Sequence, residues 1–425
     1  MLDIKFIREN PDIVKKSLKD RGLGLDLDKL LALDSERRRL LGEVEGLKSK
    51  KNNASDDIGK MLREKKDASK LMEEMKSISH KINEIDYKVE DIGKNIEKFI
   101  LDIPNITHST VPVGPDNTYN KIVKKWGEPK TFNFKPRNHL ELSELLDVID
   151  FGCAAKLTGT GFALFKGLGA RLERALINLM LDLHTKKHGY TEIFPPFLVN
   201  RKSMTGTGQL PKLEEDMYKL KDDDYFLIPT AEVPVTNIHR DDVLEEEELP
   251  IYYTAYTACF RREAGSYGKE TKGLVRVHQF DKVELVKFVR PETSFDELEK
   301  LLKDAEEVLQ LLELPYRISL LSTGDISFSA SKCYDIELHA PGSDAWLEVS
   351  SCSNFTDFQA RRANIKYKPK GAKKPAFVHT LNGSGVALAR LVVAILENYQ
   401  EKDGSVIIPK AIRPYMDNLE AIKPS

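Results

Sequence analysis

The sequence feature that most constrains the fold is a heptad repeat of apolar residues near the N-terminus. Over residues 71–99 apolar side chains recur in alternating steps of four and three, which is the a/d seam of a coiled coil. A second run with this spacing covers residues 33–61, and a polar break at residues 65–67 separates the two. We therefore predict an antiparallel helical hairpin. An arm of about 30 residues would reach on the order of 45 Å.

The charge of this hairpin leaves two interpretations open. Residues 37–70 contain eleven Lys or Arg against six Asp or Glu, an excess of five positive charges. A coiled coil of this kind can be a dimerisation element or a spacer, with its charges forming a solvated face. A two-helix arm with a basic outer half can also follow a phosphate backbone.

Composition limits the classes of protein to which the chain can belong. With 425 residues, 41% hydrophobic and 31% charged, it is long enough for two or three globular domains. We expect no membrane span, because no run of about 18 apolar residues occurs. The N-terminus lacks an apolar core, so we expect no secretory signal and no transit peptide. The spacing of the four cysteines suggests a reducing cytosol and no structural zinc, which predicts a cytoplasmic protein.

The rest of the chain has the pattern of an α+β domain. Residues 101–135 are rich in Pro, Asn, Thr and Gly, which is typical of a linker. Beyond residue 136, amphipathic helices at 168–188 and 292–312 are interspersed with β-rich runs at 225–228, 251–259 and 283–289. This order predicts an antiparallel β-sheet flanked by helices. The expected domains are 1–103 with an arm over about 30–100, a linker at 104–135, and 136–425.

Two segments place arginines where a ligand could meet them. The first is a predicted strand at 252–259 that continues into Phe260-Arg261-Arg262-Glu263 and is followed by a second strand at 275–288. An Arg at the end of a buried strand is costly unless an anion pairs with it, so Arg261 would meet a ligand or Glu263. In the second, residues 379–390, Arg390 follows a small-residue strand whose Gly383 and Gly385 would let a ligand approach the backbone. A surface position for Arg390 is the alternative.

A third segment, residues 346–354, carries oxygen ligands. Glu348 and Ser350 are expected on one face of a strand, where Glu and Ser oxygens beside a phosphate would suit Mg²⁺. The alternative is an ordinary edge-strand glutamate. No GxGxxG or GxxxxGK[ST] motif occurs, so neither a Rossmann nor a P-loop nucleotide site is supported.

Taken together, these segments resemble a known family. The strand–loop–strand at about 252–288 and the strand–helix at about 378–399 are similar to motifs 2 and 3 of class II aminoacyl-tRNA synthetases. The helix and Gly-Tyr-Thr-Glu-Ile-Phe-Pro-Pro run at about 168–196 resembles motif 1, the dimer-interface element. The stretches TGQLPK (207–212), PTAE (229–232), FRREAGS (260–266), HQF (278–280) and HTLNGSG (379–385) resemble the seryl-tRNA synthetase family, in its common zinc-free branch. The resemblance runs from residue 1 to about 420, and the hairpin resembles the family's tRNA-binding arm.

The resemblance implies an activity and its partners. It implies ATP-dependent attachment of L-serine to tRNA(Ser) through a seryl-adenylate, with release of AMP and diphosphate. tRNA(Sec) is an expected second substrate where the host has it. ATP and Mg²⁺ are implied, and zinc is not. A homodimer that binds tRNA across its two subunits is also implied.

The resemblance also assigns roles to individual residues. Arg261 and Arg390 are the implied catalytic residues, binding the phosphates and, for Arg261, the serine carboxylate. The implied ATP-binding set is Arg261, Arg262, Glu263, Val277, Phe280, Glu348, Val349, Ser350, Ser351 and Arg390. Arg262 stands where relatives often have a small polar residue, and its side chain is expected to point away from ATP. The implied serine-binding set is Thr230, Ala231, Glu232, Arg261, Glu284, Asn382 and Ser384.

Two further sets follow from the resemblance. Glu348 and Ser351 are the implied Mg²⁺ ligands, and Arg38, Lys51, Arg63 and Lys70 on the arm are expected to contact tRNA phosphates. Two alternatives remain: a catalytically silent relative that binds tRNA or a protein, and a ligase that charges a carrier protein. The intact Arg261, Glu263, Glu284 and Arg390 disfavour the first. The presence of the arm disfavours the second.

Overall fold

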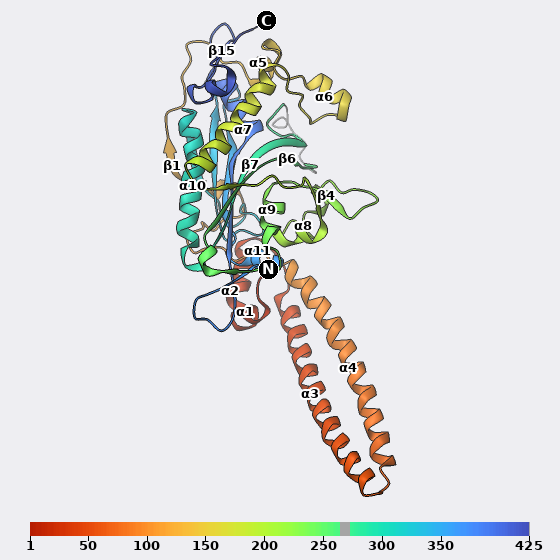
Figure 1. Ribbon diagram of the computed structural model, residues 1–425. Coiled ribbons are helices and arrows are strands. Elements are labelled where there is room, and N and C mark those ends of the chain that lie inside the picture. Colours follow the sequence, from red (N-terminus) through yellow and green to blue (C-terminus); the bar gives the residue numbers. More distant parts are fainter. Residues whose placement is uncertain (264–272, 425) are drawn as a thin grey trace. The chain divides into compact units, whose positions relative to one another are not determined.

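The structure is a computed structural model that describes residues 1–263 and 273–424 (Figure 1). The chain divides into two compact units, Leu2–Pro104 and Asn105–Ser425, the second of which also includes Met1. Among the described residues, no helix is both long and apolar enough to cross a membrane.

The N-terminal unit contains the predicted helical hairpin. Two short helices, α1 (Ile4–Glu9) and α2 (Pro11–Asp20), precede the long helices α3 (Leu27–Arg63) and α4 (Ser69–Leu101). Figure 1 shows α3 and α4 lying side by side. The side chains that hold them together come from the heptad seam and include Leu40, Val44, Ile82 and Ile85, all buried. The hairpin prediction is confirmed because a seam of this period can be buried only against a second helix.

An eight-stranded sheet forms the centre of the C-terminal unit. Its strand order is β1-β8-β9-β10-β13-β7-β6-β2, and every neighbouring pair is antiparallel except β2 and β6. The strands are β1 (Lys121–Trp126), β2 (Thr191–Glu192), β6 (Ile251–Phe260), β7 (Gln279–Val289), β8 (Tyr316–Leu320), β9 (Lys332–Ala340), β10 (Ala345–Asn354) and β13 (His379–Ala387). The α+β prediction is confirmed.

One edge of this sheet lies within the segment that composition suggested to be a linker. Strand β1 pairs with β8, and five of its six side chains are exposed. A strand that is exposed on both faces needs no apolar alternation, so no periodic signal marks β1 in the sequence.

Three helices, α7 (Leu168–Lys186), α10 (Ser294–Leu311) and α12 (Leu388–Asn398), pack on one face of the sheet. Their apolar stripes meet the inward side chains of the strands in one core, to which β7 contributes Val283 and Leu285.

Gly383 and Gly385 on β13 allow helices to pack closely against this strand. A Cβ at Gly383 would lie 2.3 Å from Leu301 Cδ2, and one at Gly385 would lie 2.8 Å from His184 Nε2. The expectation that these glycines admit a ligand is therefore wrong; they admit α10 and α7.

Smaller elements complete the unit. The remaining α-helices are α5 (His139–Leu145), α6 (Phe151–Thr158), α8 (Arg201–Thr207), α9 (Glu232–Thr236) and α11 (Phe358–Ala363). The remaining strands are β3 (Leu198–Asn200), β4 (Tyr225–Leu227), β5 (Val243–Glu245), β11 (Lys366–Lys368), β12 (Ala376–Phe377), β14 (Val406–Ile407) and β15 (Ala421–Ile422). Short 3₁₀ helices lie at Asn117–Tyr119, Glu214–Asp216, Asn237–His239, Glu246–Glu248, Pro291–Thr293 and Lys410–Met416.

Candidate active site

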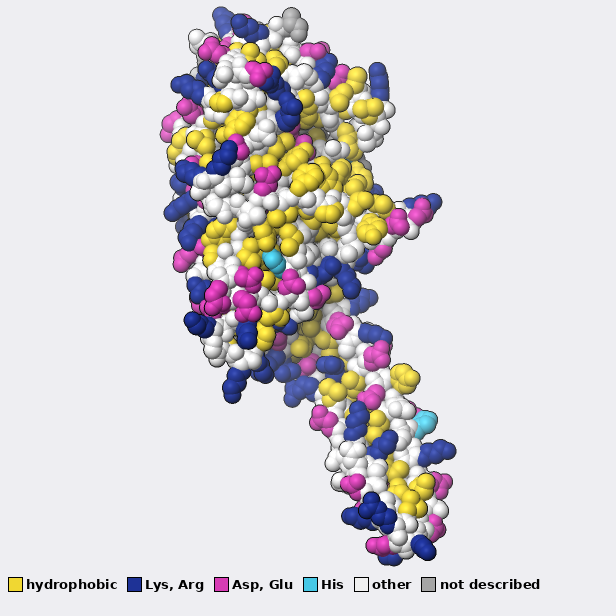
Figure 2. All heavy atoms as spheres, in the orientation of Figure 1, with side chains coloured by type: hydrophobic (Ala, Val, Ile, Leu, Met, Phe, Trp, Pro, Cys, Tyr) yellow, Lys and Arg dark blue, Asp and Glu magenta, His cyan; other side chains and the backbone are white. Residues whose placement is uncertain are grey.

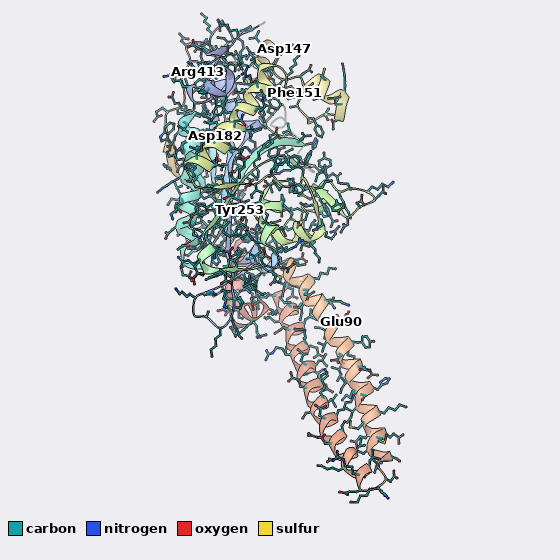
Figure 3. All side chains as sticks on the ribbon, in the orientation of Figure 1. Glu90, Asp147, Phe151, Asp182, Tyr253 and Arg413 are labelled. Atoms are coloured by element: carbon teal, nitrogen blue, oxygen red, sulfur yellow. The ribbon has the colours of Figure 1, made fainter. Side chains whose placement is uncertain are left out.

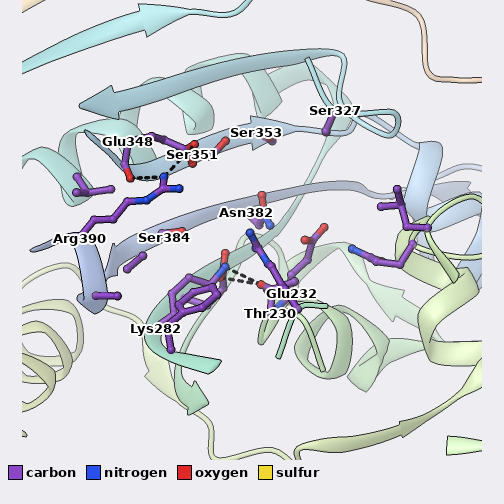
Figure 4. Close-up of a pocket in the computed structure, with 18 of the residues that line it drawn as sticks. Thr230, Glu232, Lys282, Ser327, Glu348, Ser351, Ser353, Asn382, Ser384 and Arg390 are labelled. Carbon is purple, nitrogen blue, oxygen red and sulfur yellow. Dashed lines mark hydrogen bonds and ion pairs between the residues drawn. The ribbon is translucent and has the colours of Figure 1, made fainter. Parts of the chain in front are cut away.

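A cavity of about 290 Å³ lies on the sheet face opposite these three helices (Figure 4). Because successive side chains of a strand point to opposite faces of the sheet, every second residue of the neighbouring strands faces the side on which this cavity lies. On β7, Phe280, Lys282 and Glu284 line the cavity, whereas Val283 and Leu285 point into the core. On β13, Asn382 and Ser384 line it by the same rule. Lys282, Glu284, Asn382 and Ser384 thus lie on the cavity face, whereas Val283 and Leu285 lie on the core face.

Strand β10 breaks this alternation at a bulge. The register shifts between Glu348 and Ser350 in its pairing with β9, and an extra residue in one strand reverses the faces that follow. Glu348, Ser351 and Ser353 line the cavity, whereas the buried Ser350 hydroxyl donates to Ser384 O at 2.6 Å. The expectation that Glu348 and Ser350 share a face is wrong for this reason, and Ser351 takes the place given to Ser350.

Arg261 follows directly on the last residue of β6 and lines the cavity. Its Nε donates to Pro229 O at 3.3 Å, and its guanidinium lies 5.2 Å from the centroid of the Phe280 ring. Glu263 does not pair with it, because the strand has ended and the Glu263 backbone has a φ of 49°. Glu263 instead accepts from Arg276 Nη1 at 2.9 Å. Of the FRREAGS motif, Ala264, Gly265 and Ser266 lie outside the described residues.

Arg390 stands on the first turn of α12 beside β10. Its Nε donates to Val275 O at 3.0 Å, and its Nη1 donates to Glu348 O at 2.8 Å. The same Nη1 lies 3.5 Å from Glu348 Oε2 (Figure 4). Because 28% of the Arg390 side chain stays exposed and the residue lines the cavity, its charge remains available to an anion.

The other end of the cavity holds buried carboxylates. Thr230 Oγ1 donates to Glu284 Oε2 at 2.9 Å and accepts from Lys282 Nζ at 2.8 Å. Lys282 also forms an ion pair with Glu284, and both side chains are more than nine-tenths buried. Figure 4 shows Thr230, Glu232 and Lys282 together, apart from Arg390 and Glu348.

Glu232, at the start of α9, adds a second buried carboxylate. Its Oε1 accepts from Gln359 Nε2 at 2.6 Å. Burial, and after it the charge of Glu284, raises the pKa of Glu232 to about 7. Two carboxylates therefore share this end with one ammonium group. Such a site favours a further cation, because a positive charge would stabilise the ionised form of Glu232.

Comparison with known proteins identifies the family. Residues 1–107 match the model of the seryl-tRNA synthetase N-terminal domain, and residues 217–399 match the class II core domain of the synthetases for G, H, P, S and T. A serine–tRNA ligase from Caldanaerobacter subterraneus subsp. tengcongensis is 58% identical over 416 residues, 98% of each chain. The chain belongs to the seryl-tRNA synthetase family.

Solved structures of this family agree over the full length of the chain. Seryl-tRNA synthetase from Pyrococcus horikoshii, crystallised with ATP, matches with a TM-score of 0.96 and 40% identity, and all of both chains is covered. The cytoplasmic serine–tRNA ligase of Naegleria fowleri, in complex with AMP, matches with a TM-score of 0.89 and 31% identity, covering 100% of this chain and 99% of that one.

The structure brings most of the residues predicted for a seryl-tRNA synthetase into one cavity. Those that line it are Thr230, Glu232, Arg261, Glu263, Val277, Phe280, Glu284, Glu348, Val349, Ser351, Asn382, Ser384 and Arg390. Three others lie elsewhere. Ala231 is fully buried in a separate apolar cluster, Ser350 is buried behind the bulge, and Arg262 is exposed, with its backbone N–H donating to Asp216 O at 3.0 Å.

Among the residues at this synthetase site that sequence reasoning missed, three form polar contacts with predicted ones. Lys282 could have been found, because it stands two residues before Glu284 on the same strand face. Arg276 lies in the segment before β7 and pairs with Glu263, a contact with no periodic signal. Gln359 stands on α11, far along the chain from Glu232, and nothing in its local sequence distinguishes it.

Glu348 and Ser351 are the Mg²⁺ ligands that the family implies. Glu348 and Ser351 line both this cavity and an adjoining one of about 740 Å³. Burial, followed by the charge of Glu348, raises the pKa of the neighbouring Asp335 well above its usual range. The carboxyl groups of Glu348 and Asp335 therefore lie close enough to interact, and the oxygen atoms of Glu348 and Ser351 are of the kind that a divalent cation binds. Among the described residues, no three His, Cys, Asp or Glu side chains are grouped to hold a metal. The absence of zinc stays a prediction.

Proposed function

We propose that the chain attaches L-serine to tRNA(Ser) at the expense of ATP, through a seryl-adenylate. The observation that carries this proposal is the division of charge in the cavity. Glu232 and Glu284 lie at one end, Arg390 supplies positive charge at the other, and the charge of Arg261 acts on Glu232 and lowers its pKa. An amino acid has an ammonium group and a carboxylate, so its two charges match this arrangement. The relatives solved with ATP and with AMP support the nucleotide.

The serine end of the cavity accounts for selectivity. Glu232 and Thr230 would receive the α-ammonium group, and Glu284, with Asn382 and Ser384, would receive the side-chain hydroxyl. Glu284 already accepts from Thr230 Oγ1 and pairs with Lys282, so its carboxylate is held in place. Alanine would leave this buried acceptor without its hydroxyl partner, which is a strong basis for rejecting it.

The first step needs no nucleophile from the protein. The serine carboxylate attacks the α-phosphorus, the bond to the bridging oxygen breaks, and pyrophosphate leaves. Arg261 would hold the α-phosphate and the carboxylate, Arg390 would hold the γ-phosphate, and Phe280 would stack on adenine. Bound Mg²⁺, held by Glu348 and Ser351, would offset the charge of the phosphates. Catalysis would then rest on positioning and on charge stabilisation by these side chains.

In the second step a terminal ribose hydroxyl of tRNA takes the seryl group from the adenylate, and AMP leaves. We assign residues 1–103 to tRNA binding and 136–425 to catalysis. The arm residues Arg38, Lys51, Arg63 and Lys70 support this assignment, because all four side chains are exposed. Unlike Arg39, which pairs with Glu36 and Glu43, none of the four forms an ion pair within the described part of the chain. Their charges are therefore available to phosphates.

We further propose a homodimer in which the arm of one subunit presents tRNA to the cavity of the other. Exposed apolar groups near the segment that resembles motif 1 support an interface: Phe194 is 75% exposed and Leu198 is 44% exposed. Figure 2 shows hydrophobic side chains gathered around the region where Figure 3 labels Tyr253.

The use of tRNA(Sec) as a second substrate and a cytoplasmic location of the protein stay predictions.

Serine-dependent exchange of pyrophosphate into ATP, followed by charging of tRNA(Ser), tests the proposed function. We expect exchange with L-serine and little with L-alanine or L-threonine. Absence of exchange with serine would overturn the assignment to a ligase and favour a silent relative. Exchange without tRNA charging, but with transfer to a carrier protein, would favour the carrier-protein ligase.

A mixed dimer tests transfer across subunits. One subunit would lack residues 48–77 of the arm and the other would carry Arg261→Ala. Charging by this heterodimer, with both parent homodimers inactive, requires the arm and the cavity to come from different subunits. No charging would show that tRNA stays within one subunit.

A further inference from the structure

Gln359 is a fully buried amide next to the carboxylate end of the cavity, and it does not itself line the cavity. Its Nε2 donates to Glu232 Oε1 at 2.6 Å and to Thr207 O at 3.2 Å. Its Oε1 accepts from Thr380 Oγ1 at 2.7 Å. Both amide hydrogens and the carbonyl oxygen are therefore used. The side chain joins four elements: α11, the end of α8, the start of α9 and strand β13.

These contacts fix which way the amide faces. Rotating it by 180° would place its oxygen against the carboxylate of Glu232 and the carbonyl of Thr207, two groups that can only accept. The Thr380 hydroxyl would then face the amide nitrogen instead of the oxygen. The observed orientation is thus the one in which each partner has the required donor or acceptor.

The same contacts restrain Glu232. One carboxylate oxygen is tied back by Gln359, while the residue still lines the cavity. Its backbone N–H donates to Thr230 Oγ1 at 3.2 Å, so Glu232 is restrained at its backbone as well as at its side chain. Thr380 stands on the same strand as Asn382 and Ser384, and Thr207 adjoins Gly208 and Gln209 of the cavity wall. Gln359 therefore sets Glu232 relative to the rest of the amino-acid pocket.

We propose that Gln359 is a positioning residue for the amino-acid substrate: it holds Glu232 so that the remaining carboxylate oxygen receives the α-ammonium group. This inference rests on the proposed function and names a determinant of its substrate recognition. Gln359 touches neither reactant, so its effect passes through Glu232.

The ionisation of Glu232 gives the inference a second readout. The groups that face its carboxylate are Glu284 and Lys282 from β7, Arg261 after β6, and the neutral Gln359 from α11. Burial and Glu284 raise the pKa of Glu232, whereas Gln359, Lys282 and Arg261 lower it, with a result of about 7. Only the ionised form binds an ammonium group well. Removing the hydrogen bond from Gln359 should therefore raise this pKa and move the acid limb of serine binding to higher pH.

The test compares Gln359→Met with Gln400→Met. Methionine keeps the approximate length and loses the hydrogen bonds. Gln400 is an equally buried amide that donates to Arg137 O and Glu397 O and lies outside the cavity. Serine-dependent pyrophosphate exchange would give KM for serine and for ATP, and kcat/KM for serine between pH 5.5 and 8.5.

For Gln359→Met we expect KM for serine to rise about tenfold or more, since a hydrogen bond to a charged group is lost. KM for ATP should stay within about twofold, and the acid limb should move to higher pH. Gln400→Met should change none of the three. Equal rises in both KM values with an unmoved pH profile would reduce Gln359 to a structural role and overturn the inference. So would wild-type values for Gln359→Met.

Gln359→Glu covers the case in which the methionine variant does not fold. It keeps the shape and the acceptor for Thr380, and places a second carboxyl group against Glu232. The acid limb should again move to higher pH, and a folded Gln359→Glu protein with the wild-type profile would overturn the inference. If the wild-type chain itself showed no serine-dependent exchange, the proposed function would fail instead, so the two failures are distinguishable.

Discussion

The arm and the catalytic cavity use charged residues in opposite ways. On the arm, Arg38 and Lys51 are exposed and form no ion pair within the described residues. In the cavity, Lys282 and Glu284 pair with each other at 7% and 1% side-chain exposure. Salt screens exposed charges, so each contributes little to binding and several are needed together. Buried charges are costly without a partner, so each one restricts what can bind beside it.

The comparison indicates two kinds of recognition in one chain. The arm suits a long polyanion that is contacted at many equivalent points. The cavity suits a small zwitterion for which each group has one counterpart. Damage to the arm should therefore be graded and dependent on salt, whereas damage to the cavity should be abrupt and specific to one substrate.

Removing the outer half of the arm should give the largest effect. Replacing residues 48–77 with a short Gly/Ser loop keeps the buried seam of Leu40, Val44, Ile82 and Ile85, so the stem should stay folded. It deletes Lys51, Arg63 and Lys70. We expect tRNA charging to fall by at least about 10³-fold, because several phosphate contacts are lost together. Serine-dependent exchange should stay within about twofold, and a parallel loss of exchange would contradict the division of labour.

Arg261→Ala should come next. Losing a guanidinium at the reacting centre should lower pyrophosphate exchange by about 10²- to 10³-fold. Arg290→Ala is the matched control, because Arg290 is half-exposed, pairs with Glu246 at 3.2 Å and lies outside the cavity. Near-normal exchange by a folded Arg261→Ala protein would show that Arg261 does not act on ATP or the serine carboxylate.

Glu284→Gln separates binding of serine from binding of ATP. The loss of a charged acceptor should raise KM for serine by about ten- to a hundredfold, with little change for ATP. Glu297→Gln provides the comparison, since Glu297 also pairs with a buried lysine, Lys287, at 3.1 Å but lies outside the cavity. It should lower the thermal midpoint and spare KM for serine. A raised KM for ATP alone in Glu284→Gln would move Glu284 to the nucleotide site.

The smallest effect should be that of a single arm charge. Arg38→Ala should weaken tRNA binding a few-fold and reduce the slope of log affinity against log salt by about one. Arg39→Ala is the control on the next residue, because Arg39 is already paired with Glu36 at 2.9 Å. Equal losses in the two variants would mean that pairing within the arm does not decide which charges meet tRNA.

How much could be predicted from the sequence differs between these two regions. The hairpin was predictable because its stability rests on one short-range period, with Ile82 and Ile85 on the side that faces Leu40 and Val44. The strands that line the cavity were predictable in their approximate positions, and β7 begins four residues later than the predicted start at Val275. Family motifs supplied many of the charged and hydroxyl-bearing cavity residues, but they could not show that Ser350 turns away from it.

The sequence by itself determined the helical arm, the α+β class and many of the charged residues that line the cavity. These depend on local periodicity and on motifs whose residues are close along the chain. Only the tertiary structure decided the rest. The β10 bulge moved Ser350 out of the site, and close helix packing explained Gly383 and Gly385. Gln359 reached Glu232 from 127 residues away. Such contacts are set by how strands and helices pack, and the energy of a buried hydrogen bond depends on that packing rather than on sequence distance.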